Sequence, residues 1–153
     1  MNALELLKSD HDKVDELFKQ AEATEDENKK HGLFTQIKME LLTHTHIEET
    51  IFYPAIMVNE DIKDIVLEGI EEHKQAKTLL CEIPNLSAES EKFDPKFKVL
   101  MEDIEHHVKE EEDEMFPMVK KAFDKQQLEE LGAQMAAEKI TFQENYKSSG
   151  AVG

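Results

Sequence analysis

The sequence contains no tryptophan and only one cysteine, Cys81. A single thiol cannot form a disulfide within the chain. The first residues, MNALELLKSD, also lack the basic segment, the long apolar run and the small-residue cleavage site of a secretory signal. We therefore expect a cytoplasmic protein in which Cys81 is a small buried residue, with a redox role as the alternative.

Long hydrophobic runs and an excess of positive charge are also missing. No segment approaches the roughly 18 consecutive apolar residues of a membrane-spanning helix. The chain has 35 Asp and Glu residues against 18 Lys and Arg residues, and its formal net charge of −17 would repel nucleic-acid phosphates and anionic lipids. Nucleic acid and membranes are therefore not expected partners.

Only five glycines and four prolines interrupt the 153 residues, and alternating runs of β-branched residues are absent. The abundant Glu, Lys, Leu, Ala and Met residues favour helices. We predict an all-α protein with helices at about residues 2–23, 29–59, 61–81 and 94–122, and a shorter helix after Asp124. The short connections favour an antiparallel up-down-up-down four-helix bundle with this additional short C-terminal helix.

Apolar residues recur at steps of three or four in each predicted helix, which gives every helix one inward stripe. Asp94 as N-cap and Pro95 at the first helical position predict the start of the fourth helix. In chain order, the stripes are Leu4, Leu7, His11, Val14, Leu17 and Ala21; Leu33, Ile37, Leu41, His44, Glu48, Ile51 and Ala55; Ile62, Val66, Gly69, His73, Ala76 and Leu80; Phe97, Leu100, Ile104, His107, Glu111, Met115 and Met118; and Leu128, Leu131 and Met135.

Two segments of the chain, HTHIEETIFYP and HVKEEEDEMFP, align residue for residue when their final prolines are superposed. The HxxxE spacing in each segment places both side chains on one face of a helix, about 6 Å apart along the axis. This spacing is typical of metal ligands. The aligned pairs are His44 with His107, Glu48 with Glu111, and Pro54 with Pro117.

A one-residue rotation of the fourth helix would instead turn inward His106 and Glu110, which are also four residues apart. The alignment and the apolar stripe favour the pair that follows one residue later. They also place His46 and His106 on a flank or on the surface. Pro54 and Pro117 should lie where each helix kinks or ends, because proline lacks an amide donor.

The first and third helices each carry one histidine, without a glutamate, on the stripe. Each half of the chain therefore has one helix with a lone inward histidine followed by one helix with an inward HxxxE pair. Six titratable side chains at inward positions would be costly to bury without partners, and a metal centre would satisfy them together. Imidazole and carboxylate ligands without thiolates suit iron or manganese, and two bridging glutamates would make the centre dinuclear. The candidate metal ligands are His11, His44, Glu48, His73, His107 and Glu111.

This arrangement resembles the hemerythrin-like family, the HHE cation-binding domains, in which a lone histidine precedes HxxxE and a proline on the next helix. The resemblance covers about residues 4–122 and includes the segments EETIFYPAI and EEDEMFPMV, while LEELGAQM is similar to the family's C-terminal element. It implies a hemerythrin-like metal-binding domain at residues 1–147. The small residues of SSGAVG predict a flexible tail at 148–153.

The same resemblance implies a non-haem di-iron centre with two iron ions joined by an oxo or hydroxo bridge. The glutamates would bridge the irons, and the histidines would fill terminal positions. Oxygen-carrying members of the family place two histidines four apart on the third helix, whereas here Lys77 stands four residues after His73. The missing histidine leaves about one open position on each iron if each has roughly six. Our hypothesis is that this favours reactivity with peroxide or nitric oxide, or iron release, over reversible oxygen storage alone.

The predicted function is therefore a di-iron protein that binds O2, peroxide or NO for storage, sensing or stress defence. Two alternatives remain open at this stage. One is a di-iron enzyme that decomposes peroxide or nitric oxide, and the other is a metal-free acidic helical module that binds another protein.

Overall fold

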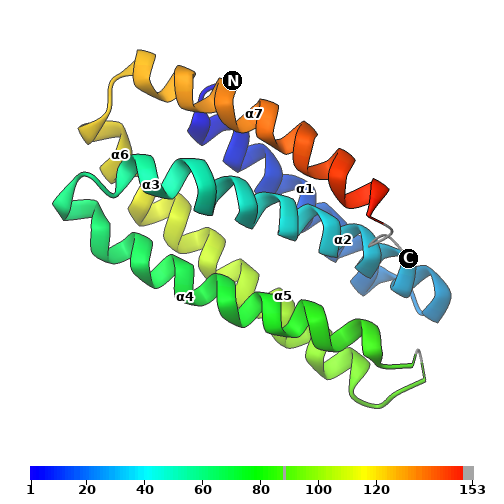
Figure 1. The fold of residues 1–153 in the computed structure, drawn as a ribbon. Helices are drawn as coiled ribbons and strands as arrows, with labels where there is room; N and C mark the ends of the chain where they lie inside the picture. The colour runs from blue at the N-terminus through cyan, green and yellow to red at the C-terminus, as the bar shows by residue number, and fades with distance from the viewer. Residues whose placement is uncertain (88, 150–153) are drawn as a thin grey trace.

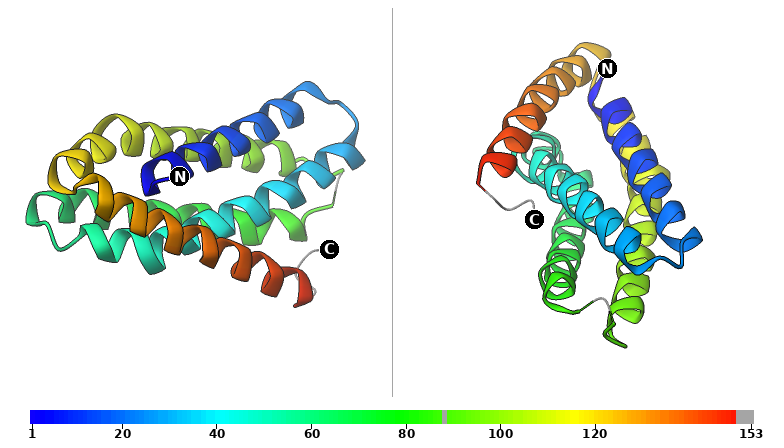
Figure 2. Two further views of the ribbon diagram at one scale, coloured as in Figure 1. Left: turned by 90° about the horizontal axis from the view of Figure 1, so that it is seen from above. Right: turned by 90° about the vertical axis from the view of Figure 1, so that its right-hand side faces the viewer.

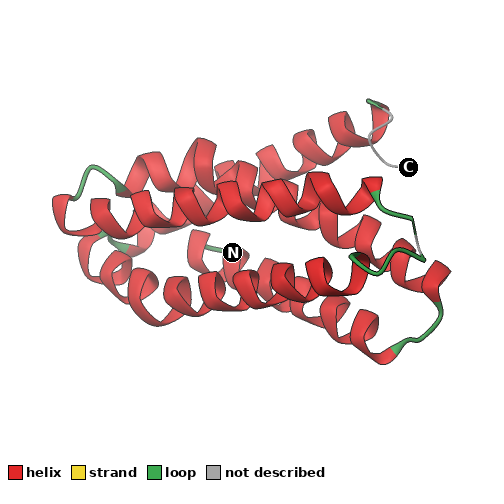
Figure 3. Ribbon diagram, turned by 90° about the horizontal axis from the view of Figure 1, so that it is seen from below, coloured by secondary structure: helices red, strands yellow, loops and turns green. Residues whose placement is uncertain are grey.

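The computed structural model describes residues 1–87 and 89–149. Every regular element among these residues is helical, without a strand, which confirms the all-α prediction (Figure 1, Figure 3). The elements are α1 (Ala3–Ala23), α2 (Glu27–Ile47), η1 (Glu48–Phe52), α3 (Tyr53–Ile56), α4 (Glu60–Glu82), η2 (Ile83–Asn85), α5 (Phe93–Glu110), η3 (Glu111–Met115), α6 (Phe116–Ala122) and α7 (Lys125–Ser148).

The long helices lie alongside one another, with α1 packed on α2 and α4 packed on α5 (Figure 1). Helix α7 covers α1 and α2 on the side away from α4 and α5 (Figure 2). The prediction of a short C-terminal helix is wrong, because α7 has 24 residues. Ser148, the first residue of the predicted tail, still belongs to α7, and residues 150–153 of that tail lie outside the described part of the chain.

Side-chain caps fix the starts of most long helices. Helix α1 begins with a reciprocal capping box, in which Asn2 and Glu5 each accept a hydrogen bond from the other's backbone amide at 2.9 Å. Asp124 and Gln127 form the same motif at α7. Asp26 accepts two backbone amides at the start of α2, which explains why this helix begins before the predicted residue 29.

Helix α5 begins without a side-chain cap. Its N-cap residue is Lys92, so the prediction of Asp94 as N-cap is wrong. Asp94 and Pro95 instead lie within the first turn of the helix. Proline is tolerated there because the first amides of a helix have no partner inside it.

The two HxxxE helices widen into π-helical turns at their glutamates. Segment η1 starts at Glu48, and segment η3 starts at Glu111. In each turn an amide donates to the glutamate carbonyl five residues earlier, from Tyr53 in η1 and from Phe116 in η3. The proline that follows each turn has no amide to donate, and the wider turn accommodates it without ending the helix.

This widening changes which residues face inward beyond each glutamate. The predicted stripe residues Ile51 and Ala55 are only half-buried, and Phe52 and Ile56 are fully buried in their place. After Glu111, the half-buried Met118 likewise gives way to buried neighbours in α6. The stripes predicted for α1 and α4 are buried throughout.

Two apolar clusters fill the interior, and a polar layer separates them. One cluster combines the start of α1 with residues of α3, α4, α6 and α7, and the other combines the second half of α1 with α2, α4 and α5. The polar layer between them contains the buried histidines of α1, α2, α4 and α5. It is therefore held in place by apolar packing on both sides.

Two further expectations concern Cys81 and membranes. Cys81 is exposed, so the prediction of a buried thiol is wrong. In the described residues, no helix combines the length and the apolar character needed to cross a membrane.

Gly132 allows α7 to pass directly over the N-terminus of α1. A Cβ atom at this position would lie 2.7 Å from the carbonyl carbon of Asn2 and 2.9 Å from the backbone nitrogen of Ala3. We expect Gly132→Ala to lower the free energy of unfolding by about 1–3 kcal/mol, because backbone atoms must move to admit the methyl group. Urea denaturation followed by circular dichroism measures the change.

The matched control is Gly32→Ala within α2, where an added Cβ would meet nothing within 4 Å. Alanine should stabilise that helix by about 0.5–1 kcal/mol. Equal effects of the two substitutions would contradict the close approach of α7 to α1.

Candidate metal centre

The structure brings all six predicted ligand residues into the polar layer. Every one is buried, with Glu48 and Glu111 no more than 1% exposed. The six residues fall into two groups of three, each with two histidines and one glutamate whose ligand atoms lie within 4.8 Å of one another. The groups are His11, His44 and Glu111, and His73, His107 and Glu48.

Each glutamate lies between the two histidine pairs. The Oε1 atom of Glu48 is 3.2 Å from His44 Nε2 on its own helical segment and 3.1 Å from His73 Nε2 on α4. The Oε1 atom of Glu111 is correspondingly 3.6 Å from His107 Nε2 and 3.1 Å from His11 Nε2. The repeat seen in the sequence therefore becomes an approximate twofold arrangement, with carboxylates shared between the halves.

An outer shell of carboxylates holds the four imidazole rings. Each ring turns Nε2 toward the centre and donates from Nδ1 to a carboxylate, which fixes the ring's orientation and leaves the Nε2 lone pair facing inward. The Nδ1–oxygen pairs are His11 with Glu112 at 2.7 Å, His44 with Asp10 at 3.1 Å, His73 with Glu49 at 2.8 Å, and His107 with Glu72 at 2.7 Å.

The sequence analysis missed these four outer carboxylates, although a signal for them exists. Each one is the immediate neighbour of an inner residue, in the pairs Asp10-His11, Glu48-Glu49, Glu72-His73 and Glu111-Glu112. A neighbour on a helix is turned by about 100°, so its side chain reaches the ring carried by the next helix. The recognisable pattern was therefore an acidic residue beside one inner ligand in each of four helical segments, at His11, Glu48, His73 and Glu111.

Lysines neutralise three of the outer carboxylates. Lys77 Nζ lies 2.8 Å from Glu49 Oε2, so the residue that replaces the missing histidine acts one layer outside the centre. Glu72 differs from the other three, because it faces His106 Nε2 at 3.6 Å and no lysine lies within 4.0 Å among the described residues. The remaining lysine contacts are Lys139 with Asp10 at 2.5 Å and Lys8 with Glu112 at 3.7 Å.

Tyr53 is a further residue of the site that the sequence analysis did not single out. It is fully buried, and its hydroxyl donates to Glu111 Oε2 at 2.8 Å. The ring stacks on His73 with centroids 5.4 Å apart. Burial and the neighbouring glutamates raise the pKa of Tyr53 well above its usual value, so the hydroxyl keeps its proton and holds the Glu111 carboxylate. A regular helix would have turned Tyr53 away from the face of Glu48, which explains why the stripe did not predict it.

The carboxylates favour positive charge at the centre. Burial alone lowers the pKa of His44 and of His107, but the nearby glutamates outweigh it. Attraction to Glu48 and hydrogen bonds to carboxylates raise the pKa of His44 well above its usual value. Attraction to Glu111, with hydrogen bonds to two further carboxylates, raises the pKa of His107 to about 10. A metal cation would supply this positive charge in place of protons.

The atoms at the centre fit a metal ion. His44 Nε2 and Glu48 Oε2 are buried without a hydrogen-bond partner. The Nε2 atoms of His73 and His107 lie 3.2 Å apart, and in neutral rings that donate from Nδ1 both present lone pairs to each other. A cation between these atoms would satisfy all of them, and a set of nitrogen and oxygen donors without sulfur suits iron or manganese.

The structure also separates the inner histidines from the others. His46 is half-buried, and its Nε2 lies 2.9 Å from Glu138 on α7, away from the centre. His106 is 66% exposed. His107 and Glu111, rather than His106 and Glu110, therefore face inward, in agreement with the alignment of the repeats.

A small, largely enclosed cavity adjoins the four imidazoles. Its volume is about 20 Å³, enough for one water-sized or diatomic molecule. Its other walls are mainly apolar, with Val14 and Leu41 on one side and Ile104 and Val108 on the other. This cavity offers space for a small ligand beside the centre.

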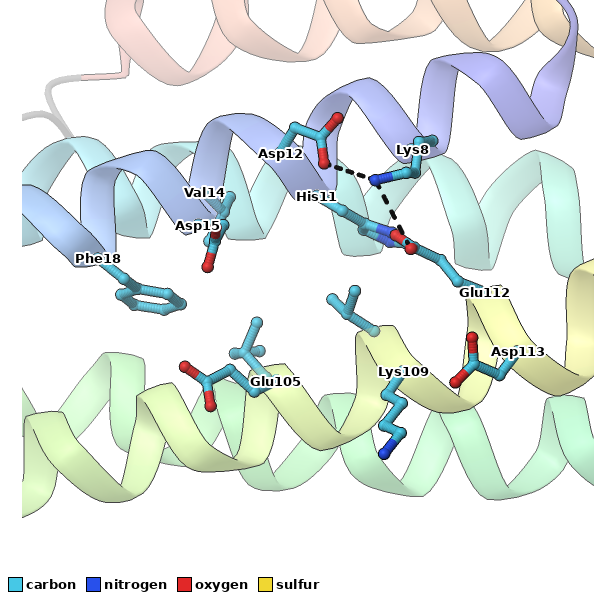
Figure 4. Close-up of a pocket in the computed structure, with 12 residues that line it drawn as sticks. Lys8, His11, Asp12, Val14, Asp15, Phe18, Glu105, Lys109, Glu112 and Asp113 are labelled. Carbon is cyan, nitrogen blue, oxygen red and sulfur yellow. Dashed lines mark hydrogen bonds and ion pairs between the residues drawn. The ribbon is translucent and has the colours of Figure 1, made fainter.

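An open pocket of about 250 Å³ lies outside this cavity, between α1 and α5 (Figure 4). His11 and Val14, together with Ile104 and Val108, line both spaces. Lys8 lies at one edge of the pocket and pairs with Asp12 and Glu112 (Figure 4). The shared residues form a thin wall between solvent and the buried cavity.

Known proteins with similar sequences include two that are longer than this chain. A "DNA nickase" of Nostoc sp. (strain PCC 7120 / SAG 25.82 / UTEX 2576) is 27% identical over 94% of this chain, and the chain spans 41% of that protein. A hemerythrin-like protein of Schizosaccharomyces pombe is 26% identical, and the chain spans 56% of it. The chain thus spans about half the length of these two relatives.

Two mycobacterial proteins match over most of their length. The uncharacterised protein Rv2633c of Mycobacterium tuberculosis is 28% identical over 90% of this chain and 84% of its own. The crystal structure of its homologue from Mycobacterium kansasii, a hemerythrin HHE cation-binding domain-containing protein, superposes with a TM-score of 0.83 at 26% identity, over 97% of this chain and 91% of the other. The hemerythrin HHE cation-binding domain profile matches residues 2–119, and the chain therefore belongs to this family.

Proposed function

We propose that this protein holds a non-haem centre of two iron ions and binds a small ligand there, namely O2, peroxide or NO. One observation supports this above all: four inward Nε2 atoms, each fixed by an outer carboxylate, surround two shared glutamates. One iron would lie in each three-residue group, and Glu48 and Glu111 would bridge the two. The proposed scaffold is the antiparallel up-down-up-down arrangement of α1, α2 to α3, α4, and α5 to α6.

The protein's own side chains would prepare this centre for a small ligand. Iron bound there would supply open coordination positions and the capacity to exchange electrons. The outer carboxylates orient the imidazoles, and Tyr53 holds Glu111 through its hydroxyl proton. The apolar side chains of Ile104 and Val108 would limit the water that reaches the cavity, whose volume of about 20 Å³ suits a molecule of only a few atoms.

We do not extend to this chain the action on DNA that the name of the Nostoc relative states. The chain spans only 41% of that protein. Its formal net charge of −17 would also repel DNA phosphates.

Metal content tests the centre directly. We expect wild-type protein from iron-supplemented cells to contain two iron ions per chain, one for each three-residue group, by mass spectrometry. His44→Ala and Glu111→Ala should lose iron, because the first removes a terminal ligand and the second removes a glutamate that the two irons would share. His46→Ala and Glu102→Ala, which remove the same groups from outside the centre, should retain it. A folded wild type that cannot be loaded with Fe(II) would leave the metal-free interaction module as the remaining alternative.

The outer carboxylates should tune iron affinity without binding iron. We expect Asp10→Asn to weaken iron binding by about 10–100-fold, because the amide no longer fixes His44 as a charged acceptor does. Competition with a chromophoric chelator measures this affinity. Asp64→Asn removes the same charge from an exposed site on α4 and should bind iron like the wild type. Equal affinities of the two variants would refute the role of the outer shell.

The wall at Val108 should control ligand access. We expect Val108→Phe to slow the association of NO with iron-loaded protein, because the larger ring fills the space between the open pocket and the cavity. Stopped-flow absorption measures the rate, and Val108→Ala should increase it. Val99→Phe places the same ring on the exposed face of α5 and serves as the control. Unchanged association in a folded, iron-loaded Val108→Phe variant would exclude this route.

A further inference from the structure

Glu72, His106 and Glu110 form a second group of metal-binding side chains, here called the outer cluster. Glu72 belongs to α4, and the other two residues belong to α5. His106 Nε2 lies 3.3 Å from Glu110 Oε2 and 3.6 Å from Glu72 Oε2, and one ligand atom from each residue lies within 4.8 Å of the others. His106 is 66% exposed, so the cluster is open to solvent.

The outer cluster occupies the place that a lysine takes elsewhere in the outer shell. Three of the four outer carboxylates are neutralised by Lys8, Lys77 and Lys139. Glu72 instead faces an imidazole and the second carboxylate of Glu110, with no lysine within 4.0 Å of either in the part of the chain that the structure describes. Two carboxylates so placed repel each other, and an external cation would give Glu72 the positive charge that each of its three counterparts receives from a lysine.

The three side chains have the chemistry of a divalent-cation site. One imidazole and two carboxylates suit Zn²⁺, Fe²⁺ or Mn²⁺, and His106 and Glu110 repeat the HxxxE spacing of the inner pairs. A surface hollow of about 320 Å³ beside His106 and Glu110 leaves room for water ligands, with Lys109 on its rim. We propose that the outer cluster binds one divalent cation, separately from the buried centre.

Glu72 connects the two sites. Its Oε1 atom accepts the Nδ1 proton of His107 at 2.7 Å, and its Oε2 atom faces His106. One carboxylate and one imidazole ring thus separate an outer cation from the centre. The existence of the outer site does not depend on the proposed function, but any influence of its cation on His107 rests on the inner ring binding iron.

Zinc titration of the iron-loaded protein tests the outer site. Isothermal calorimetry should detect one Zn²⁺ per chain, while iron analysis after the titration shows that the iron is retained. His106→Ala and Glu110→Gln should each weaken this binding by at least about tenfold, since losing a direct ligand costs no less than losing an outer-shell partner. Anomalous scattering at the zinc edge from crystals should place the ion between α4 and α5.

Matched controls and the metal-free protein complete the test. His46→Ala and Glu102→Gln remove the same groups elsewhere and should bind Zn²⁺ like the wild type. If the protein takes up no iron, His106→Ala should still lower the number of zinc ions bound by the metal-free protein, which separates this proposal from the proposed function. No zinc binding up to millimolar concentration, or zinc binding that ignores both His106 and Glu110, would overturn the outer site.

Discussion

Two carboxylates buried between apolar clusters are the constraint on which the rest of this structure depends. Glu48 and Glu111 are almost completely removed from solvent, and an uncompensated carboxylate in such a place costs several kcal/mol. Four imidazoles surround the pair, and a further carboxylate holds each imidazole. The histidines, the outer shell and the π-helical turns all serve to hold these two glutamates in position.

The layers around the glutamates do not balance in charge. Two inner and four outer carboxylates face three lysines, and the fourth outer carboxylate, Glu72, has His106 beside it in place of a lysine. Without metal, protonated imidazoles compensate part of this excess, as the raised pKa values of His44 and His107 indicate. Cations with more than one charge would compensate it more completely, and they would do so at the point where the Nε2 atoms converge.

The helices and the inward residues of α1 and α4 were predictable because regular helices keep a constant period. The prediction failed where the period changed, at the π-helical turns that begin at Glu48 and Glu111. Each turn shifts the inward face by one residue, which brings Tyr53 to the centre and replaces Ile51 with Phe52. A proline six residues after an inward glutamate allows this shift, but the helical period alone does not reveal it.

The departure from the oxygen-carrying pattern has a structural counterpart at Lys77. Its ammonium group pairs with Glu49 instead of reaching the centre, so the α4 side supplies one imidazole, as the α1 side does. The two three-residue groups are therefore equivalent in composition, and the enclosed cavity touches all four imidazoles instead of one end of the site. In the proposed di-iron centre, both irons would have the same protein ligands and would meet a small ligand from the same side. Such symmetry favours a ligand that contacts both metals over one held at a single open iron.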